Sequence, residues 1–180
     1  MLLPWGGSTV LGKVVSSLAE AGIEEIIVVT GAERESIEAL VADLAHNFPV
    51  RSVHNSAYQT GEMLSSLQCG LAEPGPQVAA ALIALGDQPQ IRPDTVCSVR
   101  RDFESGSTRI VVPSYRLRRG HPWLVARSLW AEIRALGPEM TARDFLNRHA
   151  FEISYVETGS ASILKDLDTP EDYQHPDDRD

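Results

Sequence analysis

Short apolar runs alternate with longer amphipathic segments along most of the chain. The runs are too short for comfortable helices and are bounded by turn residues, a pattern typical of strands buried within a sheet. The segments between them carry apolar residues at helical spacing, and several start at a capping residue or a proline. Predicted strands cover residues 26–30, 50–54, 78–85, 110–113, 151–156 and 163–168, and predicted helices cover 10–21, 34–48, 61–71, 93–103, 125–136 and 141–149.

This alternation predicts βαβ units and therefore an α/β fold, a three-layer α/β/α sandwich built on a mainly parallel sheet. A chain of 180 residues with 43% hydrophobic content is long enough for one ordinary domain, and two would be cramped. We expect a single domain over residues 1–173, followed by a flexible acidic tail at 174–180.

The formal net charge of −9 argues against partners that need a broad basic field, such as nucleic acid or an anionic membrane. A phosphate ligand would need positive charge supplied locally, by a metal ion or a few basic side chains. Cys69 and Cys97 fall on separate predicted helices without metal-ligand spacing, and no apolar run approaches the ~18 residues of a membrane span. The amino-terminal residues lack the basic start of a signal peptide, so a reduced, cytoplasmic protein is expected.

The apolar run at 78–85 ends abruptly in a glycine, a carboxylate and a proline. Asp87 would therefore lie just beyond the carboxyl end of a buried strand, the edge at which open α/β sheets bind ligands. Gly86 would allow a ligand to approach the backbone closely. A role beside a metal or a phosphate competes with a plain turn before Pro89, and position alone does not separate the two.

Asp166 and Asp168 end another short predicted strand. Two carboxylates from the ends of separate strands are the usual protein contribution to a Mg²⁺ site, in which the ion keeps waters and binds substrate phosphates. Such an ion would supply the positive charge that the composition lacks. The alternative is a helix cap at Asp168 or Thr169 with Pro170 in the first turn, and both roles are compatible.

Two further segments have the chemistry to contact an anion. Arg119, Gly120 and His121 lie in the most basic patch of the chain, where an arginine fork and a glycine-permitted backbone approach would grip a phosphate. The helix that begins near Gly61 offers free backbone donors, and Ser66 adds a hydroxyl. The alternatives are a solvated loop and an ordinary capped helix, which spacing alone does not exclude.

Five motifs follow one another in a fixed order. They are LLPWGG at 2–7, Asn55 with Gly61 and SSL at 65–67, LGDQP at 85–89, RGHP at 119–122 and DLDTPED at 166–172. Together they resemble the molybdenum cofactor cytidylyltransferase family, and the resemblance covers residues 2 to about 173. It implies the Rossmann-like α/β/α fold of the nucleotidyltransferases.

The resemblance also implies a Mg²⁺-dependent reaction. In it the enzyme transfers a nucleoside monophosphate, usually CMP from CTP, to the terminal phosphate of molybdopterin and releases pyrophosphate. The implied roles are catalysis and metal binding for Asp87 and Asp168, further metal binding for Asp166, nucleotide binding for Asn55, Gly61, Ser66 and Gly86, and acceptor binding for Arg119, Gly120 and His121. A molybdoenzyme or its chaperone is the further partner that this interpretation suggests.

The sequence departs from the family at its amino-terminal end. Family members begin with a strand and a glycine-rich loop of the form LAAGxSxRMG, followed by a lysine just ahead of Leu-Leu-Pro, and residues 1–180 contain neither. The first strand of the sheet is therefore expected to be missing, which would leave the strands at 26–30 and 78–85 without a shared neighbour.

We interpret the chain as an N-terminally truncated or mis-started family member that binds triphosphate poorly and turns over weakly. One alternative is a nucleotidyltransferase that uses GTP or a sugar or polyol phosphate acceptor. Another is a non-catalytic module that binds the cofactor and delivers it to a partner enzyme.

Overall fold

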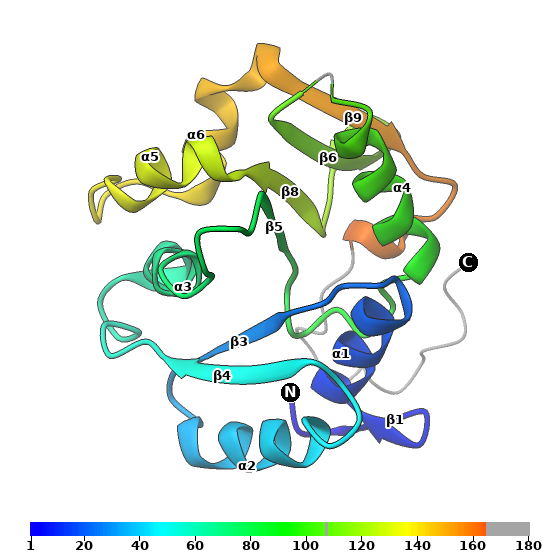
Figure 1. The fold of residues 1–180 in the computed structure, drawn as a ribbon, viewed down its shortest axis with the longest axis vertical. Helices are drawn as coiled ribbons and strands as arrows, with labels where there is room; N and C mark the ends of the chain where they lie inside the picture. Colours follow the sequence, from blue (N-terminus) through cyan, green and yellow to red (C-terminus); the bar gives the residue numbers. More distant parts are fainter. Residues whose placement is uncertain (107, 165–180) are drawn as a thin grey trace.

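The computed structural model describes residues 1–106 and 108–164, which form an α/β structure with helices packed on its sheets (Figure 1). The strands in these ranges are β1 (Pro4–Trp5), β2 (Ser8–Thr9), β3 (Ile26–Thr30), β4 (Val50–His54), β5 (Ala80–Ile83), β6 (Ile110–Tyr115), β7 (Arg118–Arg119), β8 (Trp123–Ala126) and β9 (Ile153–Glu157). The helices are α1 (Val10–Glu20), α2 (Arg34–Leu44), α3 (Glu62–Leu71), α4 (Pro93–Glu104), α5 (Trp130–Arg134) and α6 (Ala142–Arg148), with 3₁₀ turns η1 (Arg127–Leu129), η2 (Ala150–Glu152) and η3 (Ala161–Leu164). The predicted α/β class is confirmed.

The strands form two separate main sheets. β3 and β4 pair in parallel, whereas the larger sheet has the order β5-β8-β6-β7 with β9 alongside β6. The larger sheet is mixed, since β9 is parallel to β6 and the other pairs are antiparallel. Within the described residues no strand lies between β3 and β5, which agrees with the expected absence of the first strand (Figure 1).

Local chemistry explains where α1 begins and ends. The hydroxyl of Thr9 accepts a hydrogen bond from the backbone N–H of Gly12 at 3.0 Å, which caps the first turn. Gly22 adopts a φ of +78°, a left-handed conformation that glycine reaches without strain and that stops the helix. The buried face of α1 packs with α2 on the face of β3 that carries Ile26 and Val28. The helix therefore fixes β3 by burying one of its faces.

A second core lies under the larger sheet, between β6 and β8 on one side and α5 and α6 on the other. Phe145 is completely buried there and stacks on Trp123 with ring centroids 6.4 Å apart. This packing ties α6 to β8.

One predicted element is of the wrong type. The sequence predicts a helix over 125–136, but its first residues belong to β8, and only Trp130–Arg134 is α-helical. The run Trp123–Ala126 is short, and periodicity cannot distinguish a short buried strand from a buried helical segment. Antiparallel pairing with both β5 and β6 decides the outcome.

Other predicted elements are shorter than expected. The helix predicted to reach residue 48 ends at Leu44, and the apolar run at 78–85 forms a strand only over Ala80–Ile83. All four β5 residues are half-buried, not buried on both faces, because β5 lies at a sheet edge. Ile163 belongs to the 3₁₀ turn η3 and not to a strand, while 165–168 and the tail at 174–180 lie outside the described residues. No helix of the described residues is long and apolar enough to cross a membrane.

A charged cluster joins α6 to the neighbouring elements. The imidazole of His149 lies within 2.9 Å of a Glu152 carboxylate oxygen and 3.0 Å of Glu132. Burial opposes protonation of this ring, but the hydrogen bonds to the two carboxylates outweigh it and raise the pKa of His149. The hydrogen bond from Arg109, and then that from His149, lowers the pKa of Glu152.

The directions of these two pKa shifts predict the pH range in which His149 stabilises the fold. A raised histidine pKa stabilises the fold below about pH 6.5, and this contribution is lost as pH rises through the folded-state pKa. A lowered glutamate pKa stabilises the fold above about pH 4.3, and this contribution is lost as pH falls through the folded-state pKa. We expect His149→Gln to lower the free energy of unfolding most between about pH 4.5 and 6.5.

Urea unfolding across a pH series measures this difference. His46→Gln is the matched control, since His46 is exposed and its ring contacts the backbone carbonyl of Asp43 and not a carboxylate. A difference between wild type and His149→Gln that stays constant up to pH 9 would contradict the expected window.

Candidate active site

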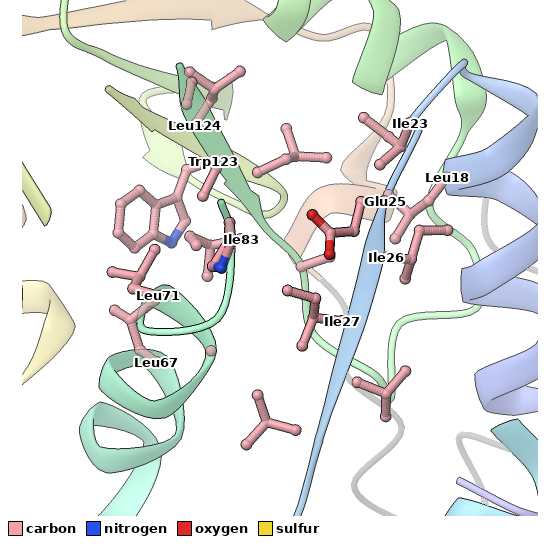
Figure 2. Close-up of a pocket in the computed structure, with 18 of the residues that line it drawn as sticks. Leu18, Ile23, Glu25, Ile26, Ile27, Leu67, Leu71, Ile83, Trp123 and Leu124 are labelled. Atoms are coloured by element: carbon pink, nitrogen blue, oxygen red, sulfur yellow. The ribbon is translucent and has the colours of Figure 1, made fainter. Parts of the chain in front are cut away.

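A cavity of about 1220 Å³ lies between β3 and β5. Its walls are mainly apolar side chains from β3, α3, β5 and β8, as Figure 2 shows for Ile27 on one side and Leu71, Ile83 and Trp123 on the other. Small-molecule pockets usually enclose about 300–1,000 Å³, so this space exceeds what a small ligand needs.

Asp87 and Gly86 also line this cavity, in the turn that follows β5. A Cβ atom added at Gly86 would lie 2.7 Å from the thioether of Met1, so the amino-terminal residue packs closely against the glycine. The next residue, Gln88, is almost fully buried, and its backbone carbonyl accepts a hydrogen bond from the backbone N–H of Ile91. The turn is therefore anchored in the protein, and it presents Asp87 at the carboxyl end of β5 as the sequence predicts.

A polar cluster lies where β4 ends. Asn55 is only 4% exposed, and its side-chain amide donates to the hydroxyls of Ser65 at 2.8 Å and Ser66 at 3.1 Å. Its carbonyl oxygen accepts a hydrogen bond from the backbone N–H of Ala57 at 3.0 Å. Asn55 thus fixes both the loop after β4 and the first turns of α3, and Ser66 lines the cavity.

Gly61 allows the loop after β4 to pack closely against the first turn of α3. It is the N-cap of α3, and no side chain caps the helix. A Cβ atom at Gly61 would collide with the side chain of Ser65, the hydrogen-bond partner of Asn55. The glycine is therefore needed for packing at the start of α3.

Replacing Asn55 with alanine is expected to lower the free energy of unfolding by about 1–3 kcal/mol, because the N–H of Ala57 and the hydroxyls of Ser65 and Ser66 lose the buried side chain that they share. Thermal unfolding followed by circular dichroism measures the change. Asn47→Ala at an exposed position is the control and should have little effect. Equal effects of the two substitutions would show that the Asn55 cluster does not stabilise the site.

The structure separates the residues of the basic loop. His121 lines the cavity, and its backbone N–H donates to the backbone carbonyl of Ile163 at 3.0 Å. A Cβ atom at Gly120 would collide with the same carbonyl, so the loop and η3 pack backbone to backbone. The guanidinium of Arg119 instead donates to Tyr155 at 2.9 Å and to Asn147 at 2.8 Å. Arg119 is therefore oriented by β9 and α6.

The cavity brings together four of the predicted site residues from three separate parts of the chain. They are Ser66, Gly86, Asp87 and His121. Asn55 reaches the same place through Ser66, and Gly61 lies at the start of the same helix. Asp166 and Asp168 lie outside the described residues.

Trp123 was given no role of its own from the sequence, although it directly follows the RGHP motif and lines the cavity. Ser65, the second serine partner of Asn55, adjoins the predicted Ser66 on the same helix.

Among the described residues, Asp87 is the predicted ligand that could bind a metal ion. These residues hold no cluster of three or more histidine, cysteine or carboxylate side chains that could bind a metal. Mg²⁺ does not require such a cluster, because it commonly takes one or two carboxylates, keeps several waters and binds substrate phosphates. One carboxylate in an open cavity fits that mode of binding.

Comparison with known proteins assigns the family. Residues 1–153 match the model of the MobA-like NTP transferase domain. The chain belongs to this family. It is therefore a nucleotidyltransferase by descent, as the five motifs indicate.

The chain is also similar to curated proteins and to solved structures. The chain is 28% identical to the nicotine blue oxidoreductase of Paenarthrobacter nicotinovorans, over 94% of this chain and 83% of the relative. It is 26% identical to the molybdenum cofactor cytidylyltransferase of Escherichia coli (strain K12), over 96% and 84% of the two chains. The crystal structure of Rv0371c from Mycobacterium tuberculosis H37Rv is similar with a TM-score of 0.79 and 26% identity, over 97% of this chain and 87% of that one, and a manganese complex of Rv0371c matches with a TM-score of 0.76.

Proposed function

We propose that this protein is a cytoplasmic enzyme that transfers CMP from CTP to the terminal phosphate of a molybdopterin-type acceptor and releases pyrophosphate. The observation that carries the proposal is the position of Asp87, at the carboxyl end of β5 in a cavity that Ser66 and His121 also line. The cytidylyltransferase relative supports CTP and molybdopterin as the substrates.

The proposed roles divide the site into a nucleotide side and an acceptor side. Asn55, Gly61, Ser66 and Gly86 bind the nucleotide, because the start of α3 offers backbone donors and hydroxyls to a phosphate. Gly120 and His121 border the acceptor. Arg119 binds the acceptor from the same side, held in place by its contacts with Tyr155 and Asn147.

Asp87 would hold Mg²⁺, with Asp168 as the second carboxylate and Asp166 as a further ligand. Bound Mg²⁺ supplies positive charge that stabilises the charge developing on the phosphates. The manganese complex of the Rv0371c relative supports a divalent metal. The residues of this chain then need only align the acceptor phosphate with the α-phosphorus and exclude water, with no covalent intermediate.

Pyrophosphate release on mixing CTP, Mg²⁺ and molybdopterin tests the proposal. We expect weak release from residues 1–180 and strong release from a fusion in which the amino-terminal segment of the E. coli cytidylyltransferase precedes Met1. Release from the fusion with GTP but not CTP, or with a sugar or polyol phosphate acceptor but not molybdopterin, would replace the proposed substrates. Tight molybdopterin binding with no turnover of any triphosphate would instead indicate a cofactor-delivery module.

A further inference from the structure

Leu117 is an exposed apolar residue in an unfavourable backbone conformation. Its side chain is 97% exposed, so it contributes almost nothing to the packing of the described residues. The turn between β6 and β7 consists of Arg116 and Leu117, with φ angles of +49° and +65°. Two-residue turns of this kind usually contain Asn, Asp or Gly, because a positive φ is costly for other residues. Leu117 therefore destabilises the free protein slightly and gains no packing in return.

The hairpin that carries this turn is held in place by β9. This strand runs parallel to β6 (Figure 1), and its last residue is Glu157. The Glu157 carboxylate accepts hydrogen bonds from the Ser114 hydroxyl at 2.7 Å and from the backbone N–H of Arg116 at 3.1 Å. The position of Leu117 is consequently fixed before any partner arrives, which lowers the entropic cost of binding.

Two arginines flank Leu117. Arg116 and Arg118 are exposed, and among the described residues neither forms an ion pair. The guanidinium of Arg116 lies over the ring of Tyr115, 5.1 Å from its centroid. Arg118 is the cross-strand partner of Tyr115, so its side chain projects from the same face of the hairpin. We call residues 115–118 the hairpin tip.

The chemistry of the hairpin tip indicates what binds to it. Tyrosine and arginine are enriched at protein interfaces, and carboxylates are the natural partners of guanidinium groups. The tip is basic in a chain whose formal net charge is −9. The rest of the chain would repel an extended anionic surface such as nucleic acid or a membrane, whereas a short acidic segment meets the tip alone. An apolar side chain in that segment would cover the exposed leucine.

We propose that the hairpin tip is a docking site for an acidic segment of a partner protein. Carboxylates of the segment pair with Arg116 and Arg118, and an apolar side chain of the segment packs against Leu117 and Tyr115. The chain continues from the tip through Arg119 to the residues assigned above to the acceptor, but docking at the tip does not depend on that assignment.

Selection from a random library of displayed peptides about 12 residues long, with the protein of residues 1–180 as the target, tests the proposal. We expect the enriched peptides to contain several Asp or Glu residues around one or two large apolar residues. Calorimetry with the synthesised peptides should show 1:1 binding. Arg118→Gln should weaken this binding about tenfold, because one charge-assisted hydrogen-bonded pair is lost.

Leu117→Gly distinguishes docking from a structural role, because it should change stability and binding in opposite directions. Glycine adopts a φ of +65° without strain, so the Tm of the variant should rise by about 2–4 °C. The same substitution removes the apolar contact and should weaken peptide binding about tenfold. Replacing a leucine that only stabilised the hairpin would instead lower the Tm.

Arg101→Gln is the matched control for Arg118→Gln. Arg101 is exposed on α4, and it too forms no ion pair within residues 1–106 and 108–164. The control removes the same charge from a different surface, so peptide affinity should stay within about twofold of the wild-type value.

Four results would overturn the proposal. Enriched peptides without acidic residues, or peptides that bind Arg118→Gln and Leu117→Gly as tightly as the wild type, would show that the tip is not their site. A lower Tm for Leu117→Gly would show that the leucine stabilises the hairpin. Dimers in sedimentation that Leu117→Gly abolishes would assign the tip to a second copy, and flotation with phosphatidylglycerol vesicles that it abolishes would assign the tip to a membrane. None of these readouts involves turnover, so a failure here is distinct from a failure of the proposed nucleotidyl transfer.

Discussion

Asp87→Asn is expected to lower CTP-dependent pyrophosphate release by about 10²- to 10³-fold in the fusion that carries the E. coli amino-terminal segment, the range seen when one group that stabilises transition-state charge is removed. The substitution keeps the shape of the side chain but removes the charge that would hold Mg²⁺ in the cavity. The KM for CTP should change less than kcat if Asp87 acts mainly in the transition state.

Asp94→Asn is the matched control. Asp94 lies in the first turn of α4 with a side chain that is 92% exposed, so the same chemical change there should leave turnover intact. Near-normal turnover of Asp87→Asn would assign Asp87 to the turn before Pro89 and remove it from the catalytic machinery. Unfolding curves of both variants distinguish lost chemistry from lost structure.

Phe145→Ala is expected to lower the free energy of unfolding by about 3–5 kcal/mol, the largest effect on stability that we predict for one residue. Phe145 is fully buried against Trp123 and lies 4.7 Å, between ring centroids, from His149. Removing the ring leaves a cavity beneath β8 and loosens α6. Because Trp123 also lines the cavity of the candidate site, the variant should weaken ligand binding as well.

Phe151→Ala provides the control for this prediction. The side chain of Phe151 is fully exposed, so the same truncation should change the free energy of unfolding by less than about 0.5 kcal/mol. Chemical denaturation of the two variants measures the difference directly. Equal losses at the two positions would show that the contacts of Phe145 do not stabilise the core.

Strands and helices with strong local signals were predicted correctly. The strands at 26–30 and 50–54 have the predicted bounds, because each is a short run closed by turn residues. The helices predicted at 10–21 and 141–149 form as α1 and α6, and the side chains of Thr9 and Thr141 cap them within one turn.

Elements that depend on distant partners were not predictable in the same way. β8 forms because β5 and β6 flank it, and the sequence of Trp123–Ala126 contains no sign of those neighbours. The position of Arg119 depends on Asn147 and Tyr155, which lie 28 and 36 residues further along the chain. A basic patch predicts that charge is present, but only tertiary contacts decide where a guanidinium points.

The sequence by itself determined the α/β class, the family and the order of the motifs, including Asp87 after an apolar strand, because these depend on local pattern and order along the chain. The tertiary structure decided that Ser66, Asp87 and His121 share one cavity, because β5, α3 and the loop before β8 meet only after folding. It also decided the register of β3 against β4 and of β5 against β8, because register is set by pairing and not by the residues of either strand alone.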